Sequence, residues 1–374
     1  MTMSLAFGLG LTTLWPVELK GFPLSRRVRV AIISDSQGAG RGAGSGPQNM
    51  DGARALSFPA RLAHHLKRIG FTASCENLSE AANNEQGSAG LPLYDPRYVA
   101  GTFSVAGGTG IGGYLITKSS ATAGGQAHLT PTVPVDTFEI YHPVATYGTL
   151  NCRIDSETVV PVNQAGTPSF KKTTIVSSAG LGMHVLNLEK SGGAGATAVF
   201  FNTIIPYNSA AKEIQIVNLS ARGWSTTDWL VADQPWRAFP ALAMMEIDIL
   251  VIMLGTNDRR TSGAGNSAAT YAANLQSIVT KSGAPKVIVA LPMPINQARI
   301  ATFSDAEQLA ACETVAANNA GQILRTDCVL PPWEIANAAS AVADDLHWRA
   351  AASDAVAASL VPLIHKAARE WEVQ

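Results

Sequence analysis

Hydrophobic positions near the start of the chain follow a strand-then-helix order. Residues 27–33 (RVRVAII) are a run rich in β-branched residues, and a glycine-rich segment follows from Gly38 to Gly46. Apolar residues then recur at helical spacing from Phe58 to Ile69, and Gly70 is well placed to end that helix. A strand followed by a helix in this way is typical of α/β proteins.

The same alternation returns in the last part of the chain. Residues 247–254 (IDILVIML) are a mostly apolar run, typical of a strand buried on both faces of a parallel sheet, and 213–219 (EIQIVNL) has similar character. The further elements we expect are a helix over 268–281, a strand over 286–292, a helix over 304–319, a strand over 322–329 and a helix over 350–369. We therefore predict a three-layer α/β/α domain on a parallel sheet.

The middle of the chain has a different pattern. From about 85 to 208 it is rich in Gly, Thr, Ser and Val, with short alternating runs. The strands we expect there are 135–141, 148–154, 158–162, 173–177, 183–188 and 197–205. Turn residues at intervals of about eight to twelve positions are typical of a β-sandwich. We predict an all-β sandwich at 85–208, inserted into an α/β domain made of 25–84 and 209–374, with an N-terminal arm at 1–24.

Composition narrows the possible functions. The chain has 374 residues, of which 47% are hydrophobic, so it can bury a large core. Only 15% are charged and the net charge is −1, which excludes a globally basic nucleic-acid binder. The first 70 residues carry nine Lys or Arg against three Asp or Glu, which we interpret as a solvated face. The four cysteines lie far apart, and we expect free, buried thiols.

Membrane and targeting signals are weak. We find no run of 18 apolar residues, so we expect no membrane-spanning helix. Residues 1–17 are mostly apolar but lack the basic start and small-residue cleavage site of a standard signal peptide. We interpret them as an arm that packs on the protein or makes a contact in a homo-oligomer or larger assembly, with an unusual export signal as the alternative. The compartment stays open, and extracellular or virion-associated action is compatible with this composition.

Four polar motifs stand after expected strands or before the last helix, where open α/β sheets place their sites. They are Ser34-Asp35-Ser36, Asn218 to Gly223, Gly255-Thr256-Asn257-Asp258 and Asp344-Asp345-Leu346-His347. Each alone has an ordinary explanation, such as a helix N-cap or a turn. In this order the set resembles the SGNH (GDSL-type) hydrolase family, whose four blocks centre on Ser, Gly, Asn and His. The resemblance covers about 28–80 and 213–370.

The resemblance implies a role for each matching residue. Ser36 is the expected nucleophile, and His347 is its base, oriented by Asp344. Backbone N–H groups of Ser36 and Gly223 and the amide of Asn257 are the expected oxyanion hole. This chemistry is reasonable in itself, because a serine hydroxyl becomes nucleophilic only when an imidazole takes its proton, and a carboxylate must fix that imidazole. We expect no metal and no cofactor.

The sequence departs from the family pattern in places. Ser34 stands where the family usually has Gly, and Gln37 where it often has Leu. Ser36 and Gly223 are 187 residues apart, where the family separates the blocks by a few tens, and the inserted strands account for the excess. The series Gly38-x-Gly40-x-x-Ala43 formally matches a dinucleotide-binding fingerprint, but the acidic residue that should end a second strand is missing, so we set that interpretation aside.

Residues beside the motifs suggest a substrate. Trp224 and Trp348 adjoin the expected site and offer stacking faces for sugar rings, although both are equally compatible with core packing. Arg259 and Arg260 follow the third motif as candidate carboxylate ligands, and solvated side chains are the simpler interpretation for both. SGNH proteins with an extra β-sandwich resemble polysaccharide O-acetylesterases, in which that domain helps to hold a glycan.

We therefore expect a serine esterase, and specifically a carbohydrate O-acetylesterase working through an acyl-serine intermediate. Its partner would be an acetylated glycan or another small ester, held in part by a carbohydrate-binding insertion. A long-chain lipase is less favoured because the sequence shows no long apolar lid segment. The alternative is a glycan-binding spike or adhesin of phage-like type, built on a hydrolase scaffold. Which ester or glycan is recognised is left open.

Overall fold

Six parallel strands form the centre of the α/β part of the molecule. The computed structural model describes residues 19–46, 49–78, 90–107, 110–119, 125–192, 197–260 and 265–373. The sheet order is β15-β14-β13-β1-β12-β2. Its strands are β1 (Val28–Ser34), β2 (Ala73–Ser74), β12 (Ile214–Asn218), β13 (Ile249–Met253), β14 (Lys286–Ala290) and β15 (Gln322–Leu324). Every residue of β1, β12 and β13 is buried, as expected for the middle of a sheet that is covered on both faces.

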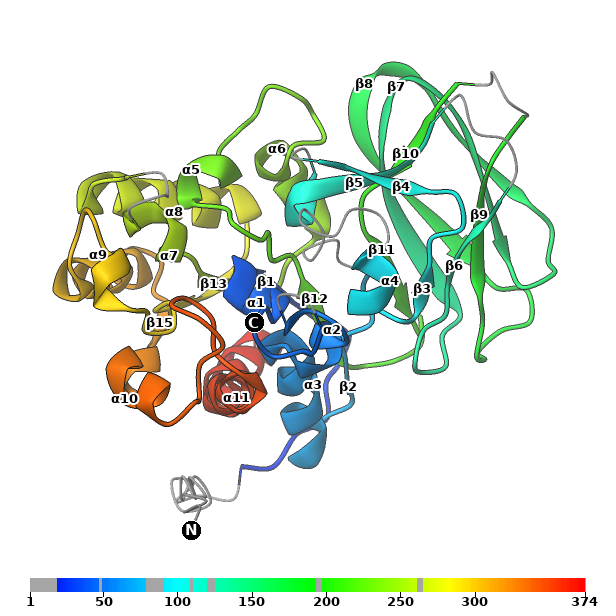
Figure 1. The fold of residues 1–374 in the computed structure, drawn as a ribbon. Helices are drawn as coiled ribbons and strands as arrows, with labels where there is room; N and C mark the ends of the chain where they lie inside the picture. Colours follow the sequence, from blue (N-terminus) through cyan, green and yellow to red (C-terminus); the bar gives the residue numbers. More distant parts are fainter. Residues whose placement is uncertain are drawn as a thin grey trace, which may run out of the picture.

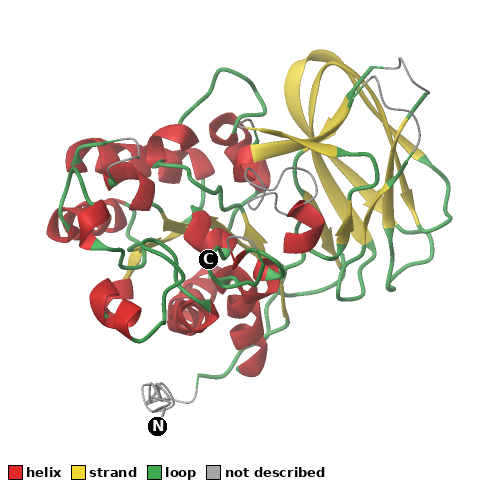
Figure 2. Ribbon diagram, viewed as in Figure 1, coloured by secondary structure: helices red, strands yellow, loops and turns green. Residues whose placement is uncertain are grey.

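Helices cover both faces of this sheet (Figures 1 and 2). On one face lie α3 (Phe58–Arg68) and α11 (Ala350–Glu372), and on the other α8 (Ala268–Ser282) and α9 (Asp305–Asn318). Alternate residues of β1 point to opposite faces, so Ile32 packs in the first core cluster and Ile33 in the second. The predicted three-layer α/β/α arrangement is confirmed.

Short helices occupy the connections. They are α1 (Ser36–Ala39), α2 (Ala53–Leu56), α4 (Gly90–Tyr94), α5 (Thr226–Trp229), α6 (Ala238–Leu242), α7 (Thr256–Arg259) and α10 (Trp333–Ala338), with 3₁₀ turns at Ile111–Gly113, Ala243–Met245, Gln297–Arg299 and Thr326–Cys328. The strand expected over 322–329 ends early, because the chain turns into the last of these 3₁₀ segments. The final helix runs beyond the expected end at residue 369.

Antiparallel strands lie between β2 and β12 in the sequence and beside the α/β part in space (Figure 1). They are β3 (Tyr98–Val99), β4 (Ser104–Gly107), β5 (Tyr114–Lys118), β6 (Ala127–Leu129), β7 (Thr137–Ile154), β8 (Val160–Val176), β9 (Leu186–Lys190), β10 (Val199–Phe201) and β11 (Ile204–Tyr207). One sheet has the order β10-β5-β4 and the other β11-β7-β9-β6-β3, with β8 paired to β7. These strands enclose their own hydrophobic cluster, which includes Phe138 and Leu188.

Several strands differ from those expected. The runs 135–141 and 148–154 belong to one long strand, β7, and the register of its pairing with β8 shifts between Val144 and Thr149. The turn-forming residues between the two runs therefore mark an irregularity in one strand rather than a hairpin. Four strands between Tyr98 and Leu129 were not expected, because they are only two to five residues long.

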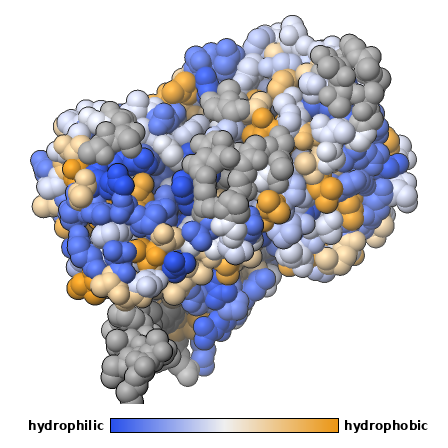
Figure 3. All heavy atoms as spheres, viewed as in Figure 1, coloured by the Kyte–Doolittle hydropathy of each residue, from blue (hydrophilic) through white to orange (hydrophobic). Residues whose placement is uncertain are grey.

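Other expectations concern the arm, the thiols and the surface. Residues 1–18 of the expected arm lie outside the described residues, and Gly21 donates to the carbonyl of Ile69 at 2.6 Å. All four cysteines are free, with Cys328 exposed and the other three buried. No helix in the described part of the chain is long and apolar enough to cross a membrane. On the face shown in Figure 3, hydrophobic residues form small separate patches.

Arg29 on β1 connects the parallel sheet to the antiparallel strands. Its guanidinium donates to Glu139 Oε2 at 2.9 Å and to the Tyr141 hydroxyl at 3.3 Å, both on β7. It also donates to Gln215 Oε1 at 2.9 Å and to the carbonyl of Met245 at 2.8 Å. A buried charge is tolerated only when it is paired and hydrogen-bonded. Arg29 therefore requires these contacts, and they hold the parallel sheet and the antiparallel strands together at one place.

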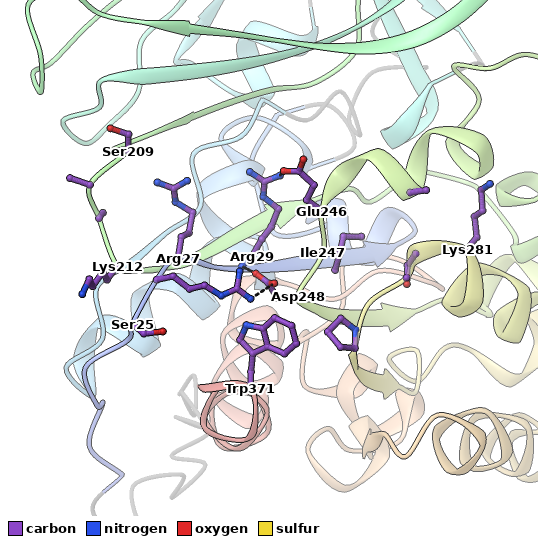
Figure 4. Close-up of a pocket in the computed structure, with 17 residues that line it drawn as sticks. Ser25, Arg27, Arg29, Ser209, Lys212, Glu246, Ile247, Asp248, Lys281 and Trp371 are labelled. Carbon is purple, nitrogen blue, oxygen red and sulfur yellow. Dashed lines mark hydrogen bonds and ion pairs between the residues drawn. The ribbon is translucent and has the colours of Figure 1, made fainter. Parts of the chain in front are cut away.

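A cavity of about 840 Å³ lies next to Arg29, at the amino ends of the central strands (Figure 4). Its lining includes several basic side chains, and two of them have clear partners: Arg26 contacts Asp248 at 3.0 Å, and Arg27 donates to the carbonyl of Asn208 at 2.6 Å. Elsewhere, Arg61 pairs with Asp354. Five of the nine basic residues among the first 70 (Arg26, Arg27, Arg29, Arg54 and Arg61) are therefore held in ion pairs with separate acidic residues.

Replacing Arg29 by Met should destabilise the protein strongly. Both Arg29 and Glu139 have side chains only 6% exposed, so the variant leaves a buried carboxylate whose remaining cationic partner is Lys172, at 3.5 Å. The expected loss in free energy of unfolding is about 3–5 kcal/mol. Arg29→Met/Glu139→Leu should lose less, because both charges are gone. Denaturant unfolding would test this, with Arg237→Met, which breaks an exposed pair with Asp233, as the control. A single-variant loss no larger than that of the control would contradict the proposed role.

Candidate active site

The turn from β1 into α1 places Ser36 at the carboxyl end of the sheet. Asp35 is the N-cap of α1, and its carboxylate accepts from the backbone N–H of Gln37 at 2.8 Å. Ser36 is the first residue of the helix, so its own N–H has no partner within the helix. A side chain at Gly38 would place Cβ 2.3 Å from Ser220 Oγ and 2.4 Å from Ser34 Cβ. Glycine is therefore required where α1 lies against these two segments.

The three expected catalytic residues form one chain of hydrogen bonds. Ser36 Oγ lies 2.8 Å from His347 Nε2. On the other side of the imidazole, Nδ1 lies 2.8 Å from both carboxylate oxygens of Asp344. Asp344 Oδ1 also accepts from the backbone N–H groups of Leu346 and His347, at 2.8 and 2.9 Å. The carboxylate is thus fixed by the turn that carries the histidine.

Electrostatics favour a neutral imidazole that can accept a proton. Burial lowers the pKa of His347, and the nearby cations of Arg41 and Arg222 lower it further, while Asp344 opposes them, leaving it below its ordinary value. Partial burial raises the pKa of Asp344. Hydrogen bonds from His347 and the electrostatic attraction between the imidazole and the carboxylate have the larger effect, and together they lower this pKa to about 2. With Asp344 ionised, the proton of the neutral imidazole belongs on Nδ1, and Nε2 can accept from Ser36.

The glycine-rich segment after α1 lies against the histidine. At Gly42, where φ is +90°, an added Cβ would lie 2.7 Å from the carbonyl oxygen of Trp348 and 3.0 Å from His347 Cβ. The N–H of Arg41 donates to the carbonyl of Ser36 at 3.0 Å. These glycines therefore allow close approach between the nucleophile turn and the histidine turn.

The segment after β12 is tied to the nucleophile turn. Ala221 N–H donates to the carbonyl of Ser34 at 2.8 Å, and the Asn218 amide donates to the carbonyl of Gly38 at 3.3 Å. Gly223 follows with a φ of +76°, and an added Cβ there would meet no atom within 4 Å. The left-handed backbone, rather than lack of space, is what favours glycine at this position.

Asn257 lies between the other two segments. Its Nδ2 donates to the carbonyl of Trp224 at 3.0 Å and lies 3.5 Å from Asp35 Oδ2. Its Oδ1 accepts from Arg260 Nη1 at 2.8 Å, and this contact fixes which end of the amide is the donor. Asn257 is therefore adjacent to Trp224, which follows Gly223, and to Asp35, which precedes Ser36. The structure brings together all three expected oxyanion-hole positions.

Two residues outside the expected triad and oxyanion hole belong to this arrangement. Asp35 is fully buried, and burial raises its pKa to about 6. Arg260 orients Asn257 as described above. In the sequence, the evidence for a role of Asp35 is its position beside Ser36 at the end of a buried strand. The same position is equally compatible with an ordinary helix N-cap. The signal for Arg260 was weaker still, because Arg259 beside it is equally basic.

A cavity of about 400 Å³ opens beside the catalytic residues. It is lined by Arg41, Arg260, Arg299, Asp344, Asp345, Leu346 and His347. Of the substrate-binding candidates from the sequence, neither Arg259 nor Trp348 is among the described residues that line it. Arg259 is buried and pairs with Asp305. Trp348 is 3% exposed, packs in the core and donates from its indole to the carbonyl of Pro294.

Trp224 has an intermediate position. Its ring is partly buried against the core and makes an edge contact with Trp229 at a centroid distance of 5.6 Å. Its carbonyl, rather than its indole, is the group that contacts Asn257. Among Trp224, Trp348 and Arg259, Trp224 is the one that the structure leaves beside the oxyanion-hole positions.

The fold of this chain is similar to that of a solved structure. This chain is similar to a structure described as a peptidoglycan O-acetylesterase in action, with a TM-score of 0.65 and 15% identity over 92% of each chain. The fold is that of the SGNH hydrolases. Because the match covers 92% of this chain, it includes most of the antiparallel strands as well as the parallel sheet of the SGNH fold.

Other comparisons give weaker likenesses to this SGNH fold. A family two carbohydrate esterase from Cellvibrio japonicus matches with a TM-score of 0.31 and 10% identity over 76% of this chain and 97% of that one. A carbohydrate acetylesterase from Sinorhizobium meliloti matches with a TM-score of 0.33 and 15% identity over 40% and 78%. No protein-family model matches the sequence, and no curated protein sequence matches it.

The imidazole of His347 should titrate below its ordinary pKa of about 6.5. NMR titration of the folded protein would measure this, with the signal assigned by its loss in His347→Gln. Asp344→Asn should lower the midpoint further, because the carboxylate that favours the charged imidazole is removed. Asp345→Asn is the matched control and should move the midpoint much less, since that carboxylate binds Arg299. A wild-type midpoint above 7, or an upward shift in Asp344→Asn, would contradict the described electrostatics.

Proposed function

We propose that the protein is a serine esterase that removes acetyl groups from a polysaccharide through an acyl-serine intermediate. The observation that carries this proposal is the hydrogen-bonded series from Ser36 through His347 to Asp344. A nucleophile, a neutral base and a group that orients the base are the parts that acyl transfer requires. They lie beside a cavity that opens to solvent.

The first half-reaction follows from this geometry. Ser36 Oγ attacks the acetyl carbonyl carbon while His347 Nε2 takes the hydroxyl proton, and the carbonyl electrons move onto the oxygen. That oxyanion would accept hydrogen bonds from the N–H groups of Ser36 and Gly223 and from Asn257 Nδ2. When the intermediate collapses, the bond to the sugar oxygen breaks, and His347 gives its proton to that oxygen. The sugar leaves with a hydroxyl, and the acetyl group stays on Ser36.

The second half-reaction uses the same groups with water. His347 takes a proton from a water molecule, whose oxygen attacks the acetyl-serine carbonyl. Collapse of this second intermediate breaks the ester bond to Ser36, which regains its proton from His347, and acetate is released. Asp344 stabilises the charged imidazole in both halves, and its pKa of about 2 keeps it ionised throughout.

The more specific part of the proposal is that the acetyl ester is carried by a glycan. It is supported by the likeness in fold to a peptidoglycan O-acetylesterase and by the substantial antiparallel part of the chain. In this proposal the strands between β3 and β11 hold the polysaccharide while the parallel sheet presents the nucleophile. A glycan-binding spike without turnover is the alternative, and the short Ser36–His347 contact argues against it, because binding alone does not require an activated serine.

Ser36→Ala should abolish ester hydrolysis. The assay measures acetate release from 4-nitrophenyl acetate, with butyrate and octanoate esters alongside, and the wild type should prefer the acetate. Ser34→Ala is a matched control two residues earlier, because its hydroxyl has no hydrogen-bond partner in the described part of the chain, and it should retain turnover. Equal rates for wild type and Ser36→Ala would exclude Ser36 as the nucleophile. A folded wild type with no activity on any ester would favour the binding protein.

Asn257→Ala should lower kcat by about 10²–10³ without unfolding the protein, because one preformed oxyanion donor is lost. Steady-state kinetics on the acetate ester would give the change, and thermal unfolding would show that the fold is retained. The effect should lie in kcat rather than in KM, since the oxyanion exists only in the transition state and the intermediates. Near-normal turnover in a folded Asn257→Ala protein would remove this residue from the oxyanion hole.

A further inference from the structure

The turn that carries His347, residues 343–348 (the histidine turn), lies between α10 and α11. It is closed by a hydrogen bond from the N–H of Ala343 to the carbonyl of His347, at 2.7 Å. Asp344 orients the imidazole from within the same turn. These bonds are internal to the turn, so they do not set the distance from the imidazole to Ser36. Proton transfer depends on that distance.

The segment after β14 holds the histidine turn from one side. The indole N–H of Trp348 donates to the carbonyl of Pro294 at 2.6 Å. The backbone N–H of Asn296 donates to the carbonyl of Asp345 at 2.9 Å, and its side-chain amide donates to Asp345 Oδ1 at 3.0 Å. Residues 293–296, which we call the bridging segment, are therefore tied to the histidine turn at several points.

Gln37 connects the bridging segment to the nucleophile. It directly follows Ser36 in α1 and is 2% exposed. Its Oε1 accepts from the backbone N–H of Met293 at 2.9 Å, and this contact fixes which end of the amide is the oxygen. Its Nε2 donates to the carbonyls of Met293 and Leu346, both at 3.3 Å. One buried amide thus contacts the bridging segment and the histidine turn at once.

Gln37 is also a position at which this sequence departs from the SGNH pattern, which often has Leu there. A leucine side chain has no donor or acceptor, so it cannot make these contacts. Burying an amide is unfavourable unless it is hydrogen-bonded, and the partners of Gln37 lie on the two segments described above. Burial alone therefore favours the apolar residue, and the amide at this position has to be explained by what it connects.

We propose that Gln37 is a positioning residue that sets the distance between Ser36 Oγ and His347 Nε2. This inference rests on the proposed esterase function. Because Ser36 and Gln37 are neighbours in α1, a bond from Gln37 to another segment fixes that segment relative to the serine. The bonds to Met293 and Leu346 fix the histidine turn in this way. The Ser36–His347 distance of 2.8 Å agrees with this role. Gln37 acts through His347 and does not touch the reacting atoms.

Gln37→Met tests this role, because methionine has a similar length and volume but lacks the amide. On 4-nitrophenyl acetate, kcat should fall by about tenfold to a hundredfold, since a misplacement of about 1 Å at a reacting group has an effect of this size. KM should change by less than about twofold, because the lost bonds do not involve the substrate. The NMR midpoint of His347 should stay close to that of the wild type, because Asp344 belongs to the same turn and still faces the imidazole.

Gln164→Met is the matched control. Gln164 on β8 is fully buried, and its amide pairs with the backbone of Phe200 in a similar way. It accepts from the N–H of Phe200 at 2.9 Å and donates to the carbonyl of the same residue. Both variants should lose a similar free energy of unfolding in denaturant, because each loses a buried amide that binds backbone groups. Only Gln37→Met should lower kcat.

Two additions keep the test decisive. If Gln37→Met does not fold, Trp348→Phe removes the bond to Pro294 from the other side of the bridging segment and should lower kcat by about threefold to tenfold. Labelling by diisopropyl fluorophosphate does not require turnover. In that reaction Ser36 Oγ bonds to phosphorus, fluoride leaves, and His347 takes the hydroxyl proton. Mass spectrometry gives the labelling rate, which should fall in Gln37→Met by about the same factor as kcat.

The outcomes separate this inference from the function on which it rests. If folded Gln37→Met matches the wild type in kcat and in labelling, the positioning role is overturned while the esterase stands. Equal losses of kcat in Gln37→Met and Gln164→Met also overturn it, because the effect then follows from lost stability. A wild type that neither hydrolyses the ester nor is labelled at Ser36 overturns the esterase and this inference together. A loss in kcat and in labelling but not in KM, confined to Gln37→Met, supports the role.

Discussion

The position of β1 between β12 and β13 is the constraint on which the site depends. These strands pair in parallel, with Ile32 opposite Asn218 and Ser34 opposite Met253, so the three strands end at one edge. The segments that leave that edge carry Ser36, Gly223 and Asn257. Parallel neighbours need long crossover connections, and the connection between β1 and β12 also contains all the antiparallel strands. Sequence distance therefore places no limit on how close these residues lie.

Such a long connection must leave the strand ends undisturbed. The bond from Ala221 N–H to the Ser34 carbonyl re-establishes the contact between the two segments after the chain returns. At the other end of the same strand, Arg29 binds Glu139 and Tyr141 of β7. A buried ion pair contributes little net stability after desolvation, but breaking it is unfavourable, so it favours one docked arrangement over others. Strand β7 is thus fixed to β1 at the end opposite to the nucleophile.

The strands and helices could be predicted from the sequence, because they follow from the periodicity of its apolar residues. The direction in which individual side chains point could not be predicted. Apolar runs located the central strands, and the order of the polar motifs located Ser36, Asn257 and His347. Arg259 and Arg260 are neighbours of the same type, yet the first is buried on Asp305 and the second reaches Asn257, because α7 ends between them. Trp348 follows His347 but turns into the core. Adjacent side chains point apart, and the pattern of residue types does not say which one faces the site.

The arginines and the histidine impose opposing electrostatic demands. Arg41 and Arg222 lower the pKa of His347, which keeps it neutral but weakens it as a base, and Asp344 opposes them. Asp344 is itself held by the backbone N–H groups of Leu346 and His347, so the carboxylate that opposes the arginines stays in place beside the imidazole. The neutral imidazole that can accept a proton is favoured by burial and by the arginines, whereas the charged imidazole that forms after proton transfer is favoured by Asp344. The two protonation states of His347 are therefore each supported by a different part of its surroundings.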